Sequence, residues 1–181
     1  MAILSEPGKI LITGATHGIG KAAAELFCSR GWEVYGISGN GEDGRGAAME
    51  KTLPGFHYRV ADVSNEPEIS ALLGRIGQLD AAFNNAGTGI APQKLPEADI
   101  ARARRVIDVN LVGTLICMKY EIAHMPGSGV VVNNASLAAF KAATGADMSY
   151  SASKAGVLAL TAEAAANPEF AGRVSFFSIA P

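Results

Sequence analysis

Short apolar runs alternate with segments of helical periodicity along the whole chain. The runs are rich in β-branched residues and bounded by glycine or polar residues, as buried strands are. We predict six strands, at residues 9–13, 33–37, 57–61, 79–84, 129–133 and 173–179. Apolar positions three and four apart predict helices at residues 19–30, directly after Ser64 or Asn65, at about residues 98–125, and at residues 150–166. Residues 38–46 form a polar, glycine-rich stretch to which no element is assigned.

This alternation of strands and helices predicts the fold class. Parallel strands need crossover connections, and helices in those connections cover both faces of the sheet. Right-handed crossovers with one reversal of winding give a doubly wound, Rossmann-like parallel sheet, with a ligand crevice at the carboxyl ends of its strands. We therefore predict an α/β fold in a single domain spanning residues 1–181.

A glycine-rich segment, T-G-A-T-H-G-I-G at residues 13–20, joins the first predicted strand to the first helix. Gly14 permits a tight exit from the strand, Gly18 lets the backbone approach a pyrophosphate, and Gly20 allows close helix–strand packing. The helix N-terminus favours an anion. The glycine spacing is GxxxGxG rather than GxGxxG, and a turn needed only for packing is the alternative. We assign Gly14, Thr16, His17, Gly18, Ile19 and Gly20 to the cofactor, although His17 can equally be a solvated loop residue.

Further candidates follow the later strands. An acid at the end of the third strand, Asp62, can accept a hydrogen bond from an adenine amino group, or it can cap the next helix. The small residues of N-N-A-G at 84–87 leave room for a ribose and a ring above the backbone, although a plain turn would look the same. The cofactor set therefore extends to Ser38, Asn40, Asp62, Val63, Asn84, Ala86 and Gly87.

Proton-transfer chemistry is indicated by Tyr150 and Lys154, which stand four positions apart and so share one helix face. An ammonium beside a phenol favours the phenolate, as a tyrosine acting as general acid or base near neutral pH requires. Ser136, beyond the fifth strand, can bond the same substrate oxygen. Asn110 is unfavourable inside a helix, and holding a water that links Lys154 to solvent would explain it. A bare Y-x-x-x-K also occurs by chance.

Taken together, these motifs resemble the short-chain dehydrogenase/reductase family. The order and spacing match from the first strand to the sixth in T-G-x-x-x-G-x-G (13–20), D-V (62–63), N-N-A-G (84–87), V-N-L-V-G-T around Asn110, Ser136, and Y-S-A-S-K (150–154).

The resemblance implies a role for each catalytic candidate. Tyr150 would be the acid/base, and Lys154 would support it and bind the nicotinamide ribose. Ser136 would orient the substrate, and Asn110 would support a proton relay. The implied reaction is hydride transfer between the C4 atom of NAD or NADP and a carbonyl or secondary alcohol carbon. Both Tyr150 and Lys154 would therefore also contact the cofactor.

The chain departs from the family pattern in three places. Ser136 and Tyr150 are one residue further apart than is usual, which a bulge within residues 141–147 would absorb. No acid follows the second strand, where NAD-preferring members carry one, so the Ser38–Asn40 segment favours NADP, with Arg45 as a distant partner. Family members also continue past Pro181 with a loop over the nicotinamide, substrate-binding helices and a seventh strand.

The third departure leaves alternatives open. The chain is either a portion of a longer protein or a short variant with an open site. A non-catalytic dinucleotide-binding module is the rival function. A nucleotide-sugar epimerase-like enzyme also uses Y-x-x-x-K, but its glycine spacing, GxxGxxG, does not fit residues 14–20.

Composition restricts the classes of binding partner and the cellular compartment that we expect. Lys and Arg number 15 against 17 Asp and Glu, so the net charge of −2 favours neither nucleic acid nor a membrane surface. No apolar run is long enough to span a bilayer, and residues 1–9 lack a secretion-signal pattern. We therefore expect a cytoplasmic protein with Cys28 and Cys117 reduced.

The sequence also bears on metal binding and association. His17, His57 and His124 do not form a cluster with ligand spacing, so no metal site is predicted. Family members commonly pair through the helices that hold Asn110 and Tyr150. Small residues along residues 152–162 would permit close approach, so we expect a homodimer or homotetramer, unless those alanines pack only on the sheet.

Overall fold

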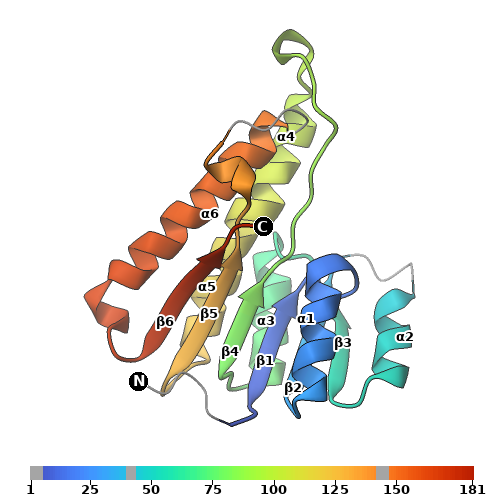
Figure 1. Ribbon diagram of the computed structural model, residues 1–181, viewed down its shortest axis with the longest axis vertical. Coiled ribbons are helices and arrows are strands. Elements are labelled where there is room, and N and C mark those ends of the chain that lie inside the picture. The colour runs from blue at the N-terminus through green and yellow to red at the C-terminus, as the bar shows by residue number, and fades with distance from the viewer. Residues whose placement is uncertain (1–5, 40–43, 142–146) are drawn as a thin grey trace.

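The computed structural model describes residues 6–39, 44–141 and 147–181 (Figure 1). Within them, all strands pair in parallel in the order β3-β2-β1-β4-β5-β6. The strands are β1 (Lys9–Thr13), β2 (Glu33–Ser38), β3 (Phe56–Val60), β4 (Ala81–Asn84), β5 (Gly129–Asn134) and β6 (Val174–Ile179). The winding reverses between β1 and β4, so the predicted doubly wound, Rossmann-like sheet is confirmed.

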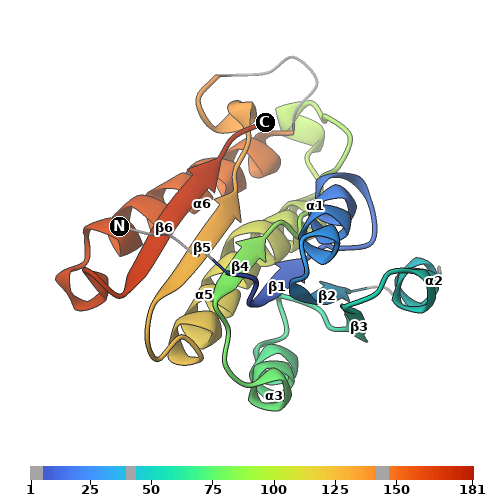
Figure 2. The ribbon, with the colours of Figure 1, turned by 60° about the horizontal axis from the view of Figure 1, so that its bottom comes forward.

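Helices cover the sheet on both faces, as Figures 1 and 2 show. The helices are α1 (Gly18–Ser29), α2 (Arg45–Thr52), α3 (Glu66–Ile76), α4 (Ile100–Ile107), α5 (Gly113–Ala123) and α6 (Met148–Ala166). Side chains alternate along each strand, so Ile10 and Ile12 join the core beneath α1 and α2, while Leu11 joins the core beneath α3 and α5. Beyond α1, an apolar groove of about 230 Å³ lies open over β4 and β5.

Two elements differ from the sequence prediction. Helix α2 was not predicted, because it buries only Gly46 and Met49 and so lacks a strong apolar stripe. The helix predicted at residues 98–125 is interrupted by a π-helical turn, Asp108–Val112, between α4 and α5. Asp99 caps α4 by accepting from the backbone N–H of Arg102 at 3.1 Å. Strand β1 has the predicted bounds, and the boundaries of the other predicted elements shift by no more than two residues.

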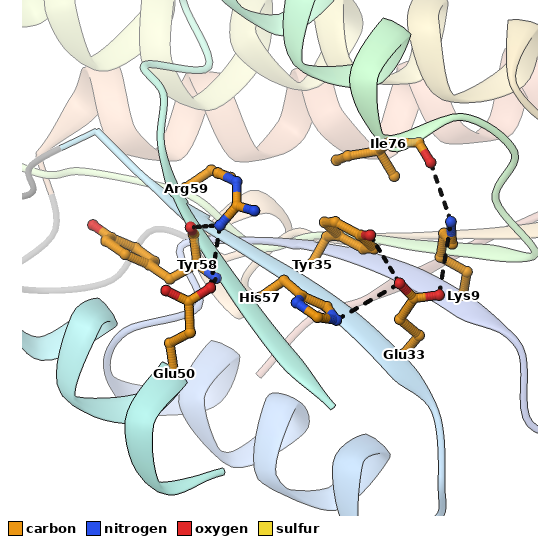
Figure 3. Close-up of polar contacts among 8 residues, drawn as sticks. All are labelled: Lys9, Glu33, Tyr35, Glu50, His57, Tyr58, Arg59 and Ile76. Atoms are coloured by element: carbon orange, nitrogen blue, oxygen red, sulfur yellow. Dashed lines mark hydrogen bonds and ion pairs between the residues drawn. The ribbon is translucent and has the colours of Figure 1, made fainter. Parts of the chain in front are cut away.

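Polar contacts secure the amino end of the sheet, opposite its ligand-binding edge (Figure 3). Glu33, the first residue of β2, accepts a hydrogen bond from the Tyr35 hydroxyl at 2.8 Å. The same carboxylate lies 3.7 Å from Lys9 Nζ and 3.6 Å from His57 Nε2. The partly exposed ion pair between Lys9 and Glu33 contributes at most about 1 kcal/mol to stability. This cluster therefore belongs to the scaffold rather than to a site.

Other features of the sequence can be placed in the same structure. Cys28 and Cys117 are free thiols. No helix in the described residues combines the length and hydropathy of a membrane span. Nor does that part of the chain contain three or more His, Cys, Asp or Glu side chains grouped to hold a metal ion.

Candidate active site

A cleft of about 380 Å³ opens at the carboxyl ends of β1, β2 and β4, where the winding reverses. Ligands of doubly wound sheets bind at this edge. Residues assigned to the cofactor from sequence line much of the cleft: Gly14, Thr16, His17, Ser38, Asp62, Val63, Ala86 and Gly87. Asn40 lies outside the described residues. Arg45 also lines the cleft, as does Arg105 of α4, which the sequence argument did not select.

The glycine loop leaves backbone N–H groups available at one wall of the cleft. Gly18 begins α1 at a φ of +53°, and a Cβ atom built on it would meet nothing within 4 Å. His17 occupies the N-cap position without a side-chain capping bond, and the first turn of α1 carries no acidic residue. An uncapped helix N-terminus beside an open cleft suits a phosphate group. The residues present therefore fit a dinucleotide pyrophosphate.

Close packing explains the other two glycines. Gly14 has a φ of +66°, and a Cβ atom there would lie 2.9 Å from Ala86 Cα. A Cβ atom on Gly20 would lie only 2.2 Å from the Gly14 carbonyl oxygen. Ile19, also assigned to the cofactor, is 46% exposed at the start of α1. The loop can keep its path only while both positions lack side chains.

A charged pair joins the segment after β3 to α4 at the wall of the cleft. Asp62 Oδ2 accepts from Arg105 Nη2 at 2.6 Å, and Asp62 Oδ1 accepts from the Ser64 hydroxyl at 2.7 Å. Burial acts to raise the pKa of Asp62, but the hydrogen bonds from Ser64 and Arg105 outweigh it, so the pKa lies below its ordinary value. Asp62 thus presents a carboxylate at the cleft wall.

Asn84, predicted as a cofactor contact, lies in the core rather than at the cleft. Its side chain is 3% exposed, and its amide nitrogen donates to Glu121 Oε2 at 2.9 Å and to Asn133 Oδ1 at 3.0 Å. The next residue, Asn85, faces the glycine loop instead and donates to the Gly14 carbonyl at 3.1 Å. The alternation of a strand therefore separates these two asparagines.

Helix α6 carries Tyr150 and Lys154, which the structure brings together. Lys154 Nζ lies 5.8 Å from the centre of the Tyr150 ring. The same nitrogen donates to the Asn134 carbonyl at 2.6 Å. Burial lowers the pKa of Lys154 to about 8, because desolvation disfavours its charged form. A buried ammonium group thus lies beside a half-buried phenol.

Asn110 ties the π-helical turn to α6. Its Oδ1 accepts from the Thr88 backbone N–H at 2.7 Å, and its Nδ2 donates to the Thr88 carbonyl at 2.9 Å and to Ser153 Oγ at 3.0 Å. The Ser153 hydroxyl donates in turn to the Tyr150 carbonyl at 2.7 Å. The asparagine that is unfavourable in a helix is therefore used where the helix departs from α geometry. The water between Asn110 and Lys154 stays a prediction.

Glycines connect the cleft with this proton-transfer group. A Cβ atom on Gly87 would lie 3.5 Å from Lys154 Nζ, and one on Gly89 would lie 3.6 Å from Tyr150 Cδ2. The cleft wall therefore runs directly into the space before Tyr150 and Lys154. A planar ligand bound over Gly87 would reach both groups.

Ser136 begins the short 3-10 turn Leu137–Ala139, which packs against α6. Its hydroxyl accepts from the Ala138 backbone N–H at 3.2 Å. The structure thus brings Ser136 to the helix that carries Tyr150. The bulge predicted within residues 141–147 falls mostly on residues 142–146, which lie outside the described part of the chain.

A glycine loop at the switch point, followed by the Tyr150–Lys154 group, agrees with the comparison to known proteins. The family model for short chain dehydrogenases matches residues 8–181. The chain belongs to this family. The match covers every strand from β1 to β6.

Relatives of this chain in the family include dehydrogenases that are named for cyclic alcohols. The chain is 37% identical over 162 residues to cis-4-hydroxycyclohexanecarboxylate dehydrogenase of Sinomonas cyclohexanicum, covering 86% of this chain and 65% of that one. It is 35% identical over 167 residues to 2,5-dichloro-2,5-cyclohexadiene-1,4-diol dehydrogenase of Sphingobium indicum, covering 87% and 65%. The chain therefore spans about two thirds of the length of these family members.

Solved structures of the family have the same fold. The chain superposes on levodione reductase with a TM-score of 0.86 and 30% identity, over 97% of this chain and 71% of the other. A short chain dehydrogenase from Mycobacterium smegmatis gives a TM-score of 0.85 at 26% identity, over 99% and 77%.

Proposed function

We propose that this chain carries the cofactor site and the proton-transfer group of an NAD(P)-dependent oxidoreductase that interconverts secondary alcohols and carbonyl compounds. The observation that carries the proposal is the position of Lys154 Nζ, buried beside the Tyr150 ring and next to Gly87 at the end of the nucleotide cleft. NAD(P), when bound, supplies or accepts the hydride.

The chain's own residues would move and hold the proton. The Tyr150 hydroxyl gives a proton to the substrate oxygen during reduction and takes it back during oxidation. Lys154 stabilises the phenolate that remains, because its positive charge lies close by in a low-dielectric setting. Ser136 would hold the same substrate oxygen, and Asn110 would keep α6 in place through Ser153.

The substrate class that we infer is a secondary alcohol on a saturated or partly saturated ring. Its support is the activity for which the two bacterial relatives are named, the oxidation of cyclohexane and cyclohexadiene alcohols. The non-catalytic module remains the second candidate, but the complete set of Asn110, Ser136, Tyr150 and Lys154 favours the enzyme.

The cofactor that we favour is NADP. Arg45 and His17 line the cleft near Ser38, and no carboxylate follows β2 at Ser38 or Gly39 to repel a 2′-phosphate. The preference for NADP can be tested by titrating the protein with NADPH and, separately, with NADH. Binding is followed by nicotinamide fluorescence. We expect saturable binding of both, with NADPH bound more tightly. Tighter binding of NADH would reverse the preference, and no binding of either by folded protein would contradict the proposed function.

The glycine loop gives a direct variant for the same titration. Gly20→Ala is expected to weaken NADPH binding at least about tenfold, or ~1.4 kcal/mol, because the added methyl displaces the Gly14 carbonyl. Gly74→Ala is the matched control. It lies exposed in α3 with nothing near its Cβ position, and it should leave binding unchanged while stabilising the helix by about 0.5–1 kcal/mol. Equal binding of NADPH by both variants would show that the glycine loop does not contribute to the cofactor site.

We also propose a homodimer or homotetramer. The small residues Ala152, Ala155, Ala159 and Ala162 lie exposed along α6, so they are available to pack against a second copy. A molar mass in solution that stays monomeric at micromolar concentration would contradict association.

A further inference from the structure

The end of β5 carries two adjacent asparagines that serve opposite faces of the sheet. Asn133 faces α5 and α6, where its amide nitrogen donates to Met118 Sδ at 3.3 Å and to Thr161 Oγ1 at 2.9 Å. Asn134, which is 9% exposed, projects the other way. Its amide nitrogen donates to Asn85 Oδ1 at 2.8 Å.

Asn134 thereby joins two parts of the candidate active site. On one side, its backbone carbonyl accepts from Lys154 Nζ at 2.6 Å. On the other, its side chain bonds Asn85, whose Nδ2 atom donates at 3.1 Å to the carbonyl oxygens of both Thr13 and Gly14 at the start of the glycine loop. The hydrogen bonds run without a gap from the buried ammonium group on α6, across the carboxyl edge of β5 and β4, to the start of the glycine loop.

Fold stability does not explain an amide at this position. The Asn134 Oδ1 atom is buried without a hydrogen-bond partner among the described residues, and an unsatisfied buried carbonyl is costly. An apolar side chain of similar size would avoid that cost. The hydrogen bond to Asn85, which an apolar side chain could not make, explains why an amide stands here.

We propose that Asn134 is a positioning residue that sets Lys154 relative to the glycine loop. The inference rests on the proposed function, because a dinucleotide must touch the loop with its pyrophosphate and Lys154 with its far ribose at the same time. Holding both contact points in place before binding removes an ordering cost from the cofactor's affinity.

The test compares Asn134→Leu, similar in size but unable to bond Asn85, with Val132→Ala as control. Val132 lies two residues earlier on the same face of β5 and makes no polar side-chain contact. Hydrogen–deuterium exchange without cofactor should become several-fold faster at residues 14–21 and 148–154 in Asn134→Leu, and not in Val132→Ala. The Kd for NADPH should rise about tenfold in Asn134→Leu and stay within twofold in the control.

A double variant tests the route through Asn85. Asn85→Ala should weaken NADPH binding alone, and adding Asn134→Leu should weaken it by no more than another twofold, because both remove the same contact. Asn134→Ser, small and polar, replaces the leucine variant if circular dichroism shows that the latter does not fold.

The outcomes separate this inference from the proposed function. If the wild type binds neither cofactor but Asn134→Leu loosens both segments, the cofactor proposal fails and the coupling stands. If the wild type binds NADPH and Asn134→Leu binds it equally well, the positioning role is overturned. Faster exchange confined to β5 overturns it as well.

Discussion

Replacing Tyr150 by phenylalanine is expected to lower kcat by about 10³-fold while changing the Kd for NADPH by no more than a few-fold. Phenylalanine keeps the ring beside Lys154 and removes only the hydroxyl that would carry the proton. General acid–base catalysis contributes factors of about 10²–10⁴ to rates, so loss of the acid should approach this range. The rate is followed by nicotinamide absorbance, with cis-4-hydroxycyclohexanecarboxylate as the first substrate.

Tyr120→Phe is the matched control for this experiment. Tyr120 lies on α5, and its hydroxyl donates at 3.0 Å to Glu66 Oε1, away from the cleft. Loss of this part-buried hydrogen bond should leave kcat within about twofold, because Tyr120 does not line the cleft. Turnover by Tyr150→Phe at the rate of the wild type would overturn the proton-transfer role of Tyr150.

The second large effect concerns stability. Replacing Glu121 by glutamine is expected to raise the free energy of unfolding at pH 8 by a few kcal/mol, at about 1.36 kcal/mol per unit of pKa difference. Glu121 is fully buried, and only one of its oxygens has a partner in the described residues, Asn84 at 2.9 Å. Burial raises the pKa of Glu121 to about 8, against a smaller opposing effect of the Asn84 hydrogen bond.

The pH window follows from the two pKa values. Below pH 4.5, the ordinary pKa of this carboxyl, both the folded and the unfolded chain hold the proton. Between pH 4.5 and about 8, the unfolded chain releases it while the folded chain keeps it, so stability falls as pH rises. Above about pH 8 this contribution levels off. Glutamine cannot ionise, so this pH-dependent loss of stability is absent from the variant.

Urea unfolding at pH 5, 6.5 and 8 measures the effect. The stability difference between Glu121→Gln and wild type should grow steadily across this range. Glu25→Gln on the surface of α1 is the control, and its stability should stay parallel to that of the wild type, because that side chain is solvated in both states. If the curve of Glu121→Gln also runs parallel, Glu121 is ionised in the fold.

The fold could be predicted from sequence because nearly every helix and strand has an apolar pattern with the period of its own secondary structure. The exceptions have local causes. Helix α2 lies at the end of the sheet and buries too few side chains to show a stripe. The π-helical turn at Asp108–Val112 depends on Asn110 bonding the backbone of Thr88, a contact between segments that no local pattern contains.

The candidate site could be predicted from sequence where its residues lie at or directly after the end of a strand. Ser38 at the end of β2, and residues directly after β1 and β4, such as Gly14 and Asn85, line the cleft because parallel strands share one carboxyl edge. In N-N at 84–85, the pattern did not indicate which asparagine faces the core. Arg105 and Asn134 form hydrogen bonds with residues far away in sequence, so these contacts can be recognised only once the helices and strands are packed.

The placement of β1 at the centre of the sheet also governs how the chain can assemble during synthesis. Ile10 pairs with Val34 on one side and with Ala81 on the other, so the second edge of β1 waits until β4 has emerged. Pairings so distant in sequence form slowly, and an unpaired strand edge invites association with other chains. One edge of β1 therefore stays unpaired between the synthesis of β2 and that of β4, and this interval exposes the chain to misassembly.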